Sequence, residues 1–587
     1  MSSVSISSFI ASLFSSPKNE DNRTNNESHK GKRSKISKES TQFSGLPECR
    51  DLIVEEKSGK KLFRSSTMIC TFIIACLVAL SLGIILSVNY KDHMFNLIAN
   101  FEVLGGIGLE LQPVNSDDVL LDGLLASGFD QESCLSRSEF FLFRKPSSKK
   151  PSPYLLLKLR NYEKLHKQCE PYSESYNRTV ELLFRNISSP VECNYIVWTG
   201  QAGLGNRILT TVSAFLYALL TDKVLLVEHE PDMADLFCEP FPDTSWLLPQ
   251  DFPLKTEFRI FNQTHPDTFG NMLMNNLVDS SKDFSLSHLY IFLASGVSFF
   301  DKLFYCNKNQ YLLRKVPWLI LVSDEYFVPS MFLMENFREE LEKMFPDKES
   351  VFHHLVRYIF HPSNKAWGLI TRFYQSYLEN ADERIGMQVR IFNSNAIPFQ
   401  KVIDQILSCM HQENFLPKLD KQKLVGPSPT KNKTSKAILI ASLHSEFYEN
   451  IKNMYWTFPT TTGEIVRVYQ ASHEEYQHFG DNTHNLKAWV EMNLLSLSNM
   501  LVTSSWSTFG YVAQGLGGLK PWILYRPENW EDKDPACHRG ISVEPCLHIP
   551  PSYDCNAKAD ADMSTVVSYV KHCEDVTSGL KLVNNYN

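Results

Sequence analysis

The longest apolar stretch of the chain lies near its N-terminus, at residues 68–88, which read MICTFIIACLVALSLGIILSV and carry no charge. At about 1.5 Å per residue, a helix of this length spans roughly 30 Å, the thickness of one bilayer core. A buried core helix is the alternative, but such a helix normally keeps a polar face. The pattern therefore predicts a transmembrane helix, since a cleaved signal peptide has a shorter apolar run closer to the N-terminus.

The charges on either side of this segment predict its orientation. Lys57, Lys60, Lys61 and Arg64 precede it, whereas the following flank places Lys91 beside an aspartate. Positive residues favour the cytosolic side, so the pattern indicates a type II topology with the C-terminal part across the membrane. We expect a disordered cytosolic tail, a signal anchor and a stem at residues 1–67, 68–88 and 89–118.

Beyond the stem, short apolar runs alternate with longer helical patterns. The expected strands are residues 195–198, 224–227, 384–392, 436–441, 464–469, 500–503 and 521–525. The expected helices are residues 207–220, 486–496 and 508–516, and residues 416–435 read as a surface loop. This alternation predicts parallel sheets in an α/β fold. The length suits two lobes, which we place at residues 119–383 and 384–587.

Composition and cysteine content narrow the class of protein. The net charge of −8 argues against a dedicated nucleic-acid binder, and a hydrophobic content of 43% rules out wholesale disorder. Ten cysteines follow the apolar segment, which permits up to five disulfides, and no pair has the CxxC spacing of a zinc site. The same region contains four glycosylation sequons, at Asn177, Asn186, Asn262 and Asn432. Both features fit a secretory lumen.

A glycine-rich turn follows the expected strand at residues 195–198 and contains Gly203, Gly205, Asn206 and Arg207. Glycine lets the backbone approach a ligand, and the N-terminus of a helix favours an anion. The turn matches neither the dinucleotide-binding motif nor the Walker motif in strict form. Two interpretations stay open, a phosphate-binding turn and a tight turn with Arg207 on the surface.

A second candidate is Arg390, near the end of the expected strand at residues 384–392. Ligands of open α/β sheets bind at the carboxyl ends of the strands, and an arginine there can hold a phosphate through two nitrogens. A salt bridge to a nearby acid is the alternative.

A hydroxyl-rich turn, TSSWSTFG at residues 503–510, joins an expected strand to an expected helix. Ser507 or Thr508 can cap the helix, but a cap accounts for only one of the five hydroxyl groups. Exposed backbone N–H groups of this turn can cradle a phosphate, which we take as the better interpretation.

The polar segment at residues 473–485 and two Asp-x-Asp triplets are the candidates for a metal site. His478 comes five residues after His473, which breaks the H-E-x-x-H spacing, so we read the segment as a helix cap. The triplets at residues 532–534 and 560–562 lie in polar, turn-like segments with no strand before them. We therefore expect no required metal and no other cofactor.

Taken together, the chain resembles the plant xyloglucan-type galactoside 2-alpha-L-fucosyltransferases over roughly residues 119–585. The blocks that carry the resemblance are residues 123–129, 202–207, 213–227, 236–249, 323–330, 352–362, 381–392, 473–485, 506–522 and 543–555. The resemblance implies a single-pass Golgi membrane enzyme with a lumenal, variant GT-B fold of two Rossmann-like lobes. It implies an inverting transfer of L-fucose from GDP-fucose to the 2-OH of a terminal galactose, on a cell-wall glycan such as xyloglucan or arabinogalactan.

The resemblance also assigns roles to residues. It implies an acceptor-side first lobe, a second lobe that binds GDP-fucose, a pyrophosphate contact at Arg390 and nucleotide binding by residues 507–510. Many members have Asp at the position of Asn393, and the wider superfamily often has a second arginine where this chain has Ile391. A second phosphate-binding arginine therefore has to come from elsewhere, and the resemblance leaves homodimer formation open.

Asp324, which follows an apolar run at residues 318–322, is our candidate for the base that accepts the proton of the attacking hydroxyl. The alternative is that Asp324 only positions a sugar or caps a turn. For the whole protein, the alternative is a non-catalytic, glycan-binding membrane protein of the same fold. A hydrolase is disfavoured because no pair of carboxylates stands out on adjacent strand ends.

Overall fold

The computed structural model describes residues 121–125, 129–144, 146–184, 191–259, 262–278, 286–294, 298–392, 398–422, 434–525 and 535–584. The expected tail, signal anchor and stem lie outside these residues, as do Asn186, Asn393, Asn432 and the triplet at residues 532–534. None of the helices within the described ranges is long and apolar enough to cross a membrane.

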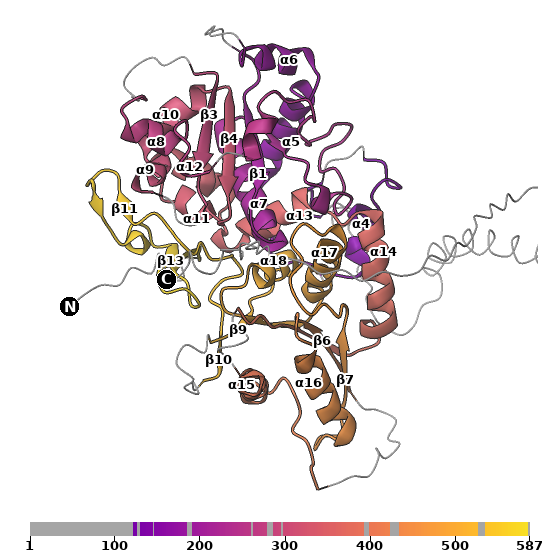
Figure 1. Cartoon of the computed structure of the whole chain (residues 1–587). Coiled ribbons are helices and arrows are strands. Elements are labelled where there is room, and N and C mark those ends of the chain that lie inside the picture. Colours follow the sequence, from indigo (N-terminus) through magenta and orange to yellow (C-terminus); the bar gives the residue numbers. More distant parts are fainter. Residues whose placement is uncertain are drawn as a thin grey trace, which may run out of the picture. The chain divides into compact units, whose positions relative to one another are not determined.

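A four-stranded, wholly parallel sheet forms the centre of the first lobe (Figure 1). Its strand order is β2-β1-β4-β3, with bounds β1 Tyr195–Gly200, β2 Val224–Val227, β3 His288–Phe292 and β4 Trp318–Ser323. β2 and β4 are buried along their whole length and β1 at five of its six residues, which explains their continuous apolar sequences.

The first lobe also contains eleven α-helices and six short helical turns in the described residues. The α-helices are α4 Leu135–Glu139, α5 Pro153–Gln168, α6 Glu174–Glu181, α7 Leu204–Thr221, α8 Phe269–Met274, α9 Phe299–Lys302, α10 Asn307–Lys315, α11 Val328–Met331, α12 Glu335–Met344, α13 Val351–Ile359 and α14 Asn364–Phe373. The short turns are η2 Phe140–Leu142, η3 Pro231–Met233, η4 Lys255–Arg259, η5 Leu303–Tyr305, η6 Lys348–Ser350 and the π-turn η7 Tyr374–Leu378.

The second lobe is built on a six-stranded sheet of order β10-β9-β8-β5-β6-β7, in which only β10 is antiparallel. The strands are β5 Glu383–Gln388, β6 Ser435–Ala441, β7 Ile465–Gln470, β8 Met500–Ser504, β9 Trp522–Leu524 and β10 Cys537–Arg539. Its helices are α15 Phe399–Gln412, α16 Ser445–Thr457, α17 Asn482–Ser496 and α18 Thr508–Gly517. The predicted parallel α/β organisation is confirmed.

Four helices bring the two lobes together: α7 and α13 of the first lobe pack against α18 of the second, and α17 packs against α18 and α7 (Figure 1). α7 is buried on almost all of its faces, as its apolar sequence predicted, because it lies between a sheet and another lobe. A single apolar cluster runs through this junction.

The C-terminal segment, residues 541–584, returns to the first lobe. The carboxylate of Glu544 accepts hydrogen bonds from Tyr326 Oη at 2.8 Å and from the backbone N–H of Phe352 at 2.9 Å. Asn584 Nδ2 donates to Asp347 Oδ1 at 2.8 Å. The short elements of this segment are β11 Tyr553–Asp554, β12 Ala559–Asp560, η8 Met563–Thr565, β13 Val570–His572 and β14 Leu580–Leu582.

All ten cysteines that follow the apolar segment form disulfides. The pairs are Cys134–Cys238, Cys169–Cys193, Cys306–Cys555, Cys409–Cys537 and Cys546–Cys573. The preference for disulfides over a zinc site is therefore confirmed, and the pairings, which the sequence left open, are now assigned.

Candidate functional site

The N-termini of helices α7 and α18 meet at the junction of the lobes, where Gly203 and Ser507 are their N-cap residues. A Cβ atom on Gly205 would lie 2.8 Å from Thr508 Oγ1 and 3.0 Å from the backbone nitrogen of Phe509. Glycine at this position therefore lets the two helices approach closely. Because each helix N-terminus carries partial positive charge, the junction favours an anion.

Asn206 joins the two lobes through both ends of its side-chain amide. Its Nδ2 donates to the backbone oxygen of Asp324 at 2.9 Å, and its Oδ1 accepts from Thr508 Oγ1 at 3.0 Å. Asp324 follows β4 at the carboxyl edge of the first sheet, and Thr508 begins α18. The structure thus brings together three residues that the sequence singled out in three separate motifs.

Arg207 lies in the same turn, but its guanidinium is held by carboxylates. Its Nη1 lies 2.6 Å from Glu230 Oε2 and 2.9 Å from Asp232 Oδ1. Burial raises the pKa of Glu230 to about 7, although the charge of Arg207 acts in the opposite direction. The Arg207 side chain is only 12% exposed, so of the two open interpretations, the one that places Arg207 on the surface is wrong.

Arg390 lies two residues beyond the end of β5, not within the strand as expected, because strand pairing stops at Gln388. Its backbone N–H donates to Ser504 Oγ at 2.9 Å, at the end of β8. No carboxylate of the described residues lies within 4.0 Å of its guanidinium. Burial lowers its pKa, so the surroundings disfavour the charge that Arg390 carries. The salt-bridge alternative is therefore absent from the described part of the chain.

The start of α18 has no side-chain cap, although the sequence offers two candidates. Thr508 Oγ1 donates instead to Asn206. No described residue accepts a hydrogen bond from the N–H groups of Phe509 and Gly510. A Cβ atom on Gly510 would lie 3.2 Å from Gln388 Oε1, so the helix start packs closely on the strand that leads to Arg390. The free amides and Arg390 lie at the same edge of the second sheet.

Asp575 is a residue of this region that the sequence analysis missed. Its Oδ2 accepts from the backbone N–H of Trp506 at 3.1 Å and from Tyr511 Oη at 2.5 Å. Trp506 adopts a left-handed conformation, with a φ of 64°, so Asp575 holds the hydroxyl-rich turn in an uncommon backbone conformation. No local motif could reveal a contact that joins residues 69 positions apart.

Glu325, next to the candidate base, is buried and accepts a hydrogen bond from the backbone N–H of His548 at 3.2 Å. Burial, assisted by the charge of Asp324, raises the pKa of Glu325 to about 8. Glu325, Lys302 and Tyr305 line a small pocket, open to solvent, beyond the ends of β3 and β4. The carboxyl edge of the first sheet thus carries an acidic pair beside a pocket.

Two groups of side chains in the described residues have the spacing of metal ligands. The first contains Cys546 and Cys573, but these form a disulfide. The second is Glu474 with His478 and His484, and here Lys487 also pairs with the carboxylate. The Asp-x-Asp triplet at residues 560–562 does contain a strand residue, contrary to expectation, but Asp560 is exposed in a two-residue strand.

Two of the four sequons lie within the described residues, and both asparagines are exposed. Asn262 Oδ1 accepts from the backbone N–H and the hydroxyl of Thr264, at 2.9 and 2.7 Å. Asn177 lies in α6, and the hydroxyl residue of its sequon, Thr179, is buried. Glycosylation at all four positions stays a prediction.

With this geometry in place, comparison with known proteins identifies the family. The model of the family described as xyloglucan fucosyltransferase matches residues 105–556, well over half of the chain. The chain belongs to the xyloglucan fucosyltransferase family.

Relatives in the family match along most of their length. The galactoside 2-alpha-L-fucosyltransferase of Arabidopsis thaliana is 52% identical over 86% of this chain and 92% of its own length. The protein of the same name from Pisum sativum is 54% identical over 80% of this chain and 83% of its own. The solved structure of an arginine-to-lysine mutant of Arabidopsis thaliana FUT1 in complex with GDP is 54% identical, covers 79% of this chain and 100% of that one, and has a TM-score of 0.74.

Proposed function

We propose that this protein is an inverting fucosyltransferase that moves L-fucose from GDP-fucose to the 2-OH of a terminal galactose. The support is the identity of more than half of the aligned residues with relatives that bear the name of this activity. In this proposal the acceptor is a galactose-terminated cell-wall glycan, xyloglucan or arabinogalactan.

The observation that carries the proposal is the position of Arg390. Its guanidinium has no carboxylate within 4.0 Å among the described residues, and it follows a strand at the carboxyl edge of the second sheet. The N–H groups of Phe509 and Gly510, which have no acceptor among the described residues, lie at the start of a helix at the same edge. A guanidinium and a free helix N-terminus together form the kind of site that binds a diphosphate.

The transfer breaks the bond between C1 of fucose and the β-phosphate oxygen, and GDP leaves with the electron pair. Arg390 and the amides of α18 stabilise the charge that builds up on the diphosphate as this bond breaks. The oxygen of the galactose 2-OH forms the new bond to C1 on the opposite face, which inverts the anomeric configuration. The hydroxyl proton passes to the carboxylate of Asp324, which releases it to solvent.

Asn206 connects the two halves of this site through hydrogen bonds. Its amide fixes the backbone of Asp324 in the first lobe to the first residue of α18 in the second. In the proposed mechanism, the lobes form a variant GT-B arrangement in which the acceptor approaches from the first sheet and the donor binds at the second.

The proposed location is the Golgi membrane, in type II orientation, with residues 119–587 in the lumen. The supporting observations are the uncharged segment at residues 68–88, the basic flank before it and the five disulfides beyond it.

Transfer in this proposal needs no metal, because cationic and amide groups neutralise the diphosphate. We expect the rate to be unchanged after dialysis against EDTA. A loss of activity on chelation that Mn²⁺ or Mg²⁺ restores would contradict this expectation.

The decisive experiment is a donor and acceptor screen with the purified membrane protein. GDP-fucose and GDP-mannose are each incubated with a galactosylated xyloglucan oligosaccharide, and with the same oligosaccharide carrying 2-deoxygalactose. We expect a fucosylated product only from GDP-fucose and the unmodified acceptor. A protein that binds the oligosaccharide but neither binds GDP nor forms product would instead be a glycan-binding protein of this fold.

A further inference from the structure

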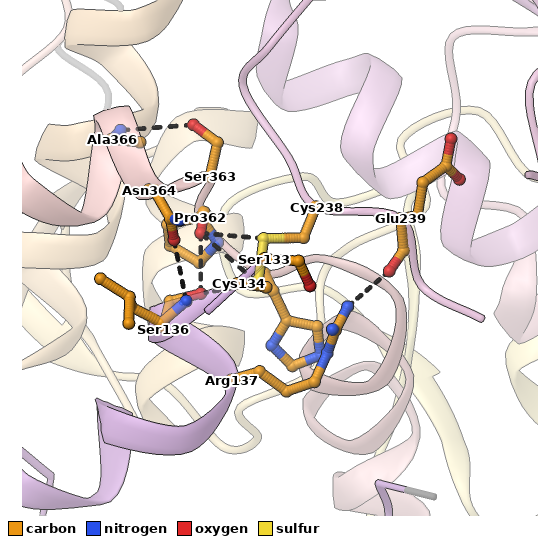
Figure 2. Close-up of a disulfide and its surroundings, with 12 residues drawn as sticks. Ser133, Cys134, Ser136, Arg137, Cys238, Glu239, Pro362, Ser363, Asn364 and Ala366 are labelled. Atoms are coloured by element: carbon orange, nitrogen blue, oxygen red, sulfur yellow. Dashed lines mark hydrogen bonds between the residues drawn. A yellow bond between two sulfur atoms is a disulfide. The ribbon is translucent and has the colours of Figure 1, made fainter. Parts of the chain in front are cut away.

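A second pocket is lined by three arginines, Arg137, Arg144 and Arg357, together with apolar side chains. Arg137 belongs to α4, Arg144 follows η2, and Arg357 lies in the last turn of α13. Figure 2 shows Arg137 beside the Cys134–Cys238 disulfide, with its guanidinium directed to the backbone of Glu239. The pocket thus lies where the N-terminal segment of the described chain packs on the junction helices.

The three guanidinium groups are buried without an ion pair. Arg137 and Arg357 are each 8% exposed, and the Nε atoms of all three arginines are buried without a hydrogen-bond partner. None of them has a carboxylate within 4.0 Å in the part of the chain that the structure describes. Such a concentration of unpaired positive charge is costly in a protein interior.

The hydrogen bonds that these arginines do make go to neutral groups. Arg144 Nη2 donates to Ser496 Oγ at 3.2 Å, and Arg357 Nη1 lies 2.9 Å from His353 Nε2. The Arg144 guanidinium also lies 3.9 Å from the centre of the Phe140 ring. These contacts orient the side chains and stabilise a cation partly, but none of them neutralises the charge.

The titration of the groups around the pocket does not remove the positive charge of the three arginines. Burial lowers the pKa of Arg137 and of Arg357 to about 10, and for Arg144 the repulsion from Arg357 adds to the effect of burial. Burial also keeps His353 and His361 neutral by lowering their pKa values well below the ordinary range.

The nearest carboxylates do not neutralise the three guanidinium groups. The charge of Glu239 opposes the effect of burial on the pKa of Arg137, but only in part. The Glu239 carboxylate accepts hydrogen bonds from Ser245 Oγ at 2.7 Å and from the backbone N–H of Trp246 at 3.2 Å. Asp122 acts on Arg357 only through its charge at longer range.

The geometry points to a binding site for one small inorganic anion, chloride in the lumen, held by Arg137, Arg144 and Arg357. The anion offsets the charge of three arginines that line one pocket, and it joins the segment that carries Arg137 and Arg144 to helix α13. This site is independent of the proposed transfer reaction, because none of its residues lies at the donor or acceptor edge. Its expected effect is on the stability of the junction between the lobes.

The direct test is a bromide soak of crystals of the protein, followed by an anomalous difference map. We expect one peak in contact with the three guanidinium groups. An empty pocket after the soak would overturn the inference, and so would electron density for an acidic side chain of the chain itself in that place.

The solution test compares the Tm in sodium chloride with the Tm in sodium gluconate at the same ionic strength. We expect the wild-type protein to melt several degrees higher in chloride, and Arg144→Met to lose this difference. Arg467→Met, on the exposed side of β7, is the control, and we expect it to keep the difference in Tm between the two salts. If Arg144→Met does not fold, Arg144→Lys replaces it, with a reduced difference expected. Equal wild-type melting in both salts, or an undiminished difference in either Arg144 variant, would overturn the inference.

Discussion

At the scale of single residues, the decisive difference is between arginines that have a carboxylate partner and arginines that have none. Arg207 and Arg390 both follow strands and both looked suited to bind phosphate. Arg207 is held by Glu230 and Asp232, whereas Arg390 has no such partner in the described chain. Spacing along the sequence cannot make this distinction, because the acids that hold Arg207 lie in a different loop.

We predict that Arg390→Lys lowers the transfer rate about 100- to 1,000-fold, because lysine keeps the charge but cannot hold two phosphate oxygens with a planar fork. The measurement is the initial rate with GDP-fucose, together with the Tm. Arg467→Lys is the matched control, since Arg467 is exposed on the same lobe. A well-folded Arg390→Lys protein with a near-normal rate would remove Arg390 from the donor site.

A second prediction concerns Glu544, whose pKa burial raises to about 8. The ordinary value is 4.5, so between pH 4.5 and 8 the folded protein holds a proton that the unfolded chain has lost. The contribution of this group to stability is therefore full below pH 4.5 and is lost as the pH rises to 8, by about 1.4 kcal/mol per pH unit.

Glu544→Gln should remove this dependence, because glutamine can still accept from the backbone N–H of Phe352 but carries no charge. We expect the variant and the wild type to melt alike at pH 5, and the variant to be the more stable of the two at pH 9. The measurement is the Tm across this range. Parallel curves for the two proteins would mean that Glu544 does not titrate with a raised pKa.

At the scale of elements, the sequence predicted most of the parallel strands, but it predicted their ends less well and marked residues 318–322 of β4 only as an apolar run. Runs such as 224–227 are buried on both faces, so their composition marks them as parallel strands. The strand at residues 383–388 was expected to reach 392, because its apolar pattern continues after the hydrogen-bonded pairing has ended. β3 was missed, since its sequence, HLYIF, gives no clear alternation.

The meeting of α7 and α18 yields the third prediction. Gly205→Ala places a methyl group 2.8 Å from Thr508 Oγ1 and 3.0 Å from a backbone nitrogen that cannot move aside alone. Overpacking of this kind costs about 1–3 kcal/mol, so we expect a lower Tm. Gly203→Ala is the control, because its methyl group would meet only Gln477 Nε2, at 3.7 Å. Equal melting of the two variants would show that the helices can separate at little cost.

At the scale of the whole molecule, contacts between distant parts of the chain are what the sequence could not supply. Motifs located Asn206, Asp324 and Thr508, but nothing local indicated that one amide joins them. The same holds for Asp575, which supports the hydroxyl-rich turn from the C-terminal segment. The number of cysteines set an upper limit on the number of disulfides, whereas the pairing of the cysteines depends on the folded structure.

The fourth prediction compares two disulfides that close loops of different length. Cys306–Cys555 joins residues 249 positions apart, and Cys169–Cys193 joins residues 24 apart. In the chain-entropy account, the loss of the longer link costs about 2 kcal/mol more than the loss of the shorter one. We therefore expect Cys306→Ser/Cys555→Ser to melt below Cys169→Ser/Cys193→Ser, and the reverse order would contradict this account.

The return of residues 541–584 to the first lobe has a consequence for biosynthesis. Glu544 lies 192 residues after its partner Phe352. At a synthesis rate of 5–20 residues per second, Glu544 is therefore made about 10–40 s later. During that time the first half of the protein lacks the partner of Phe352, and chaperones can bind the surface that Glu544 later covers. A nonsense codon close to the end of the message would therefore leave the earliest part of the protein without its partner segment, although the error lies at the other end of the chain.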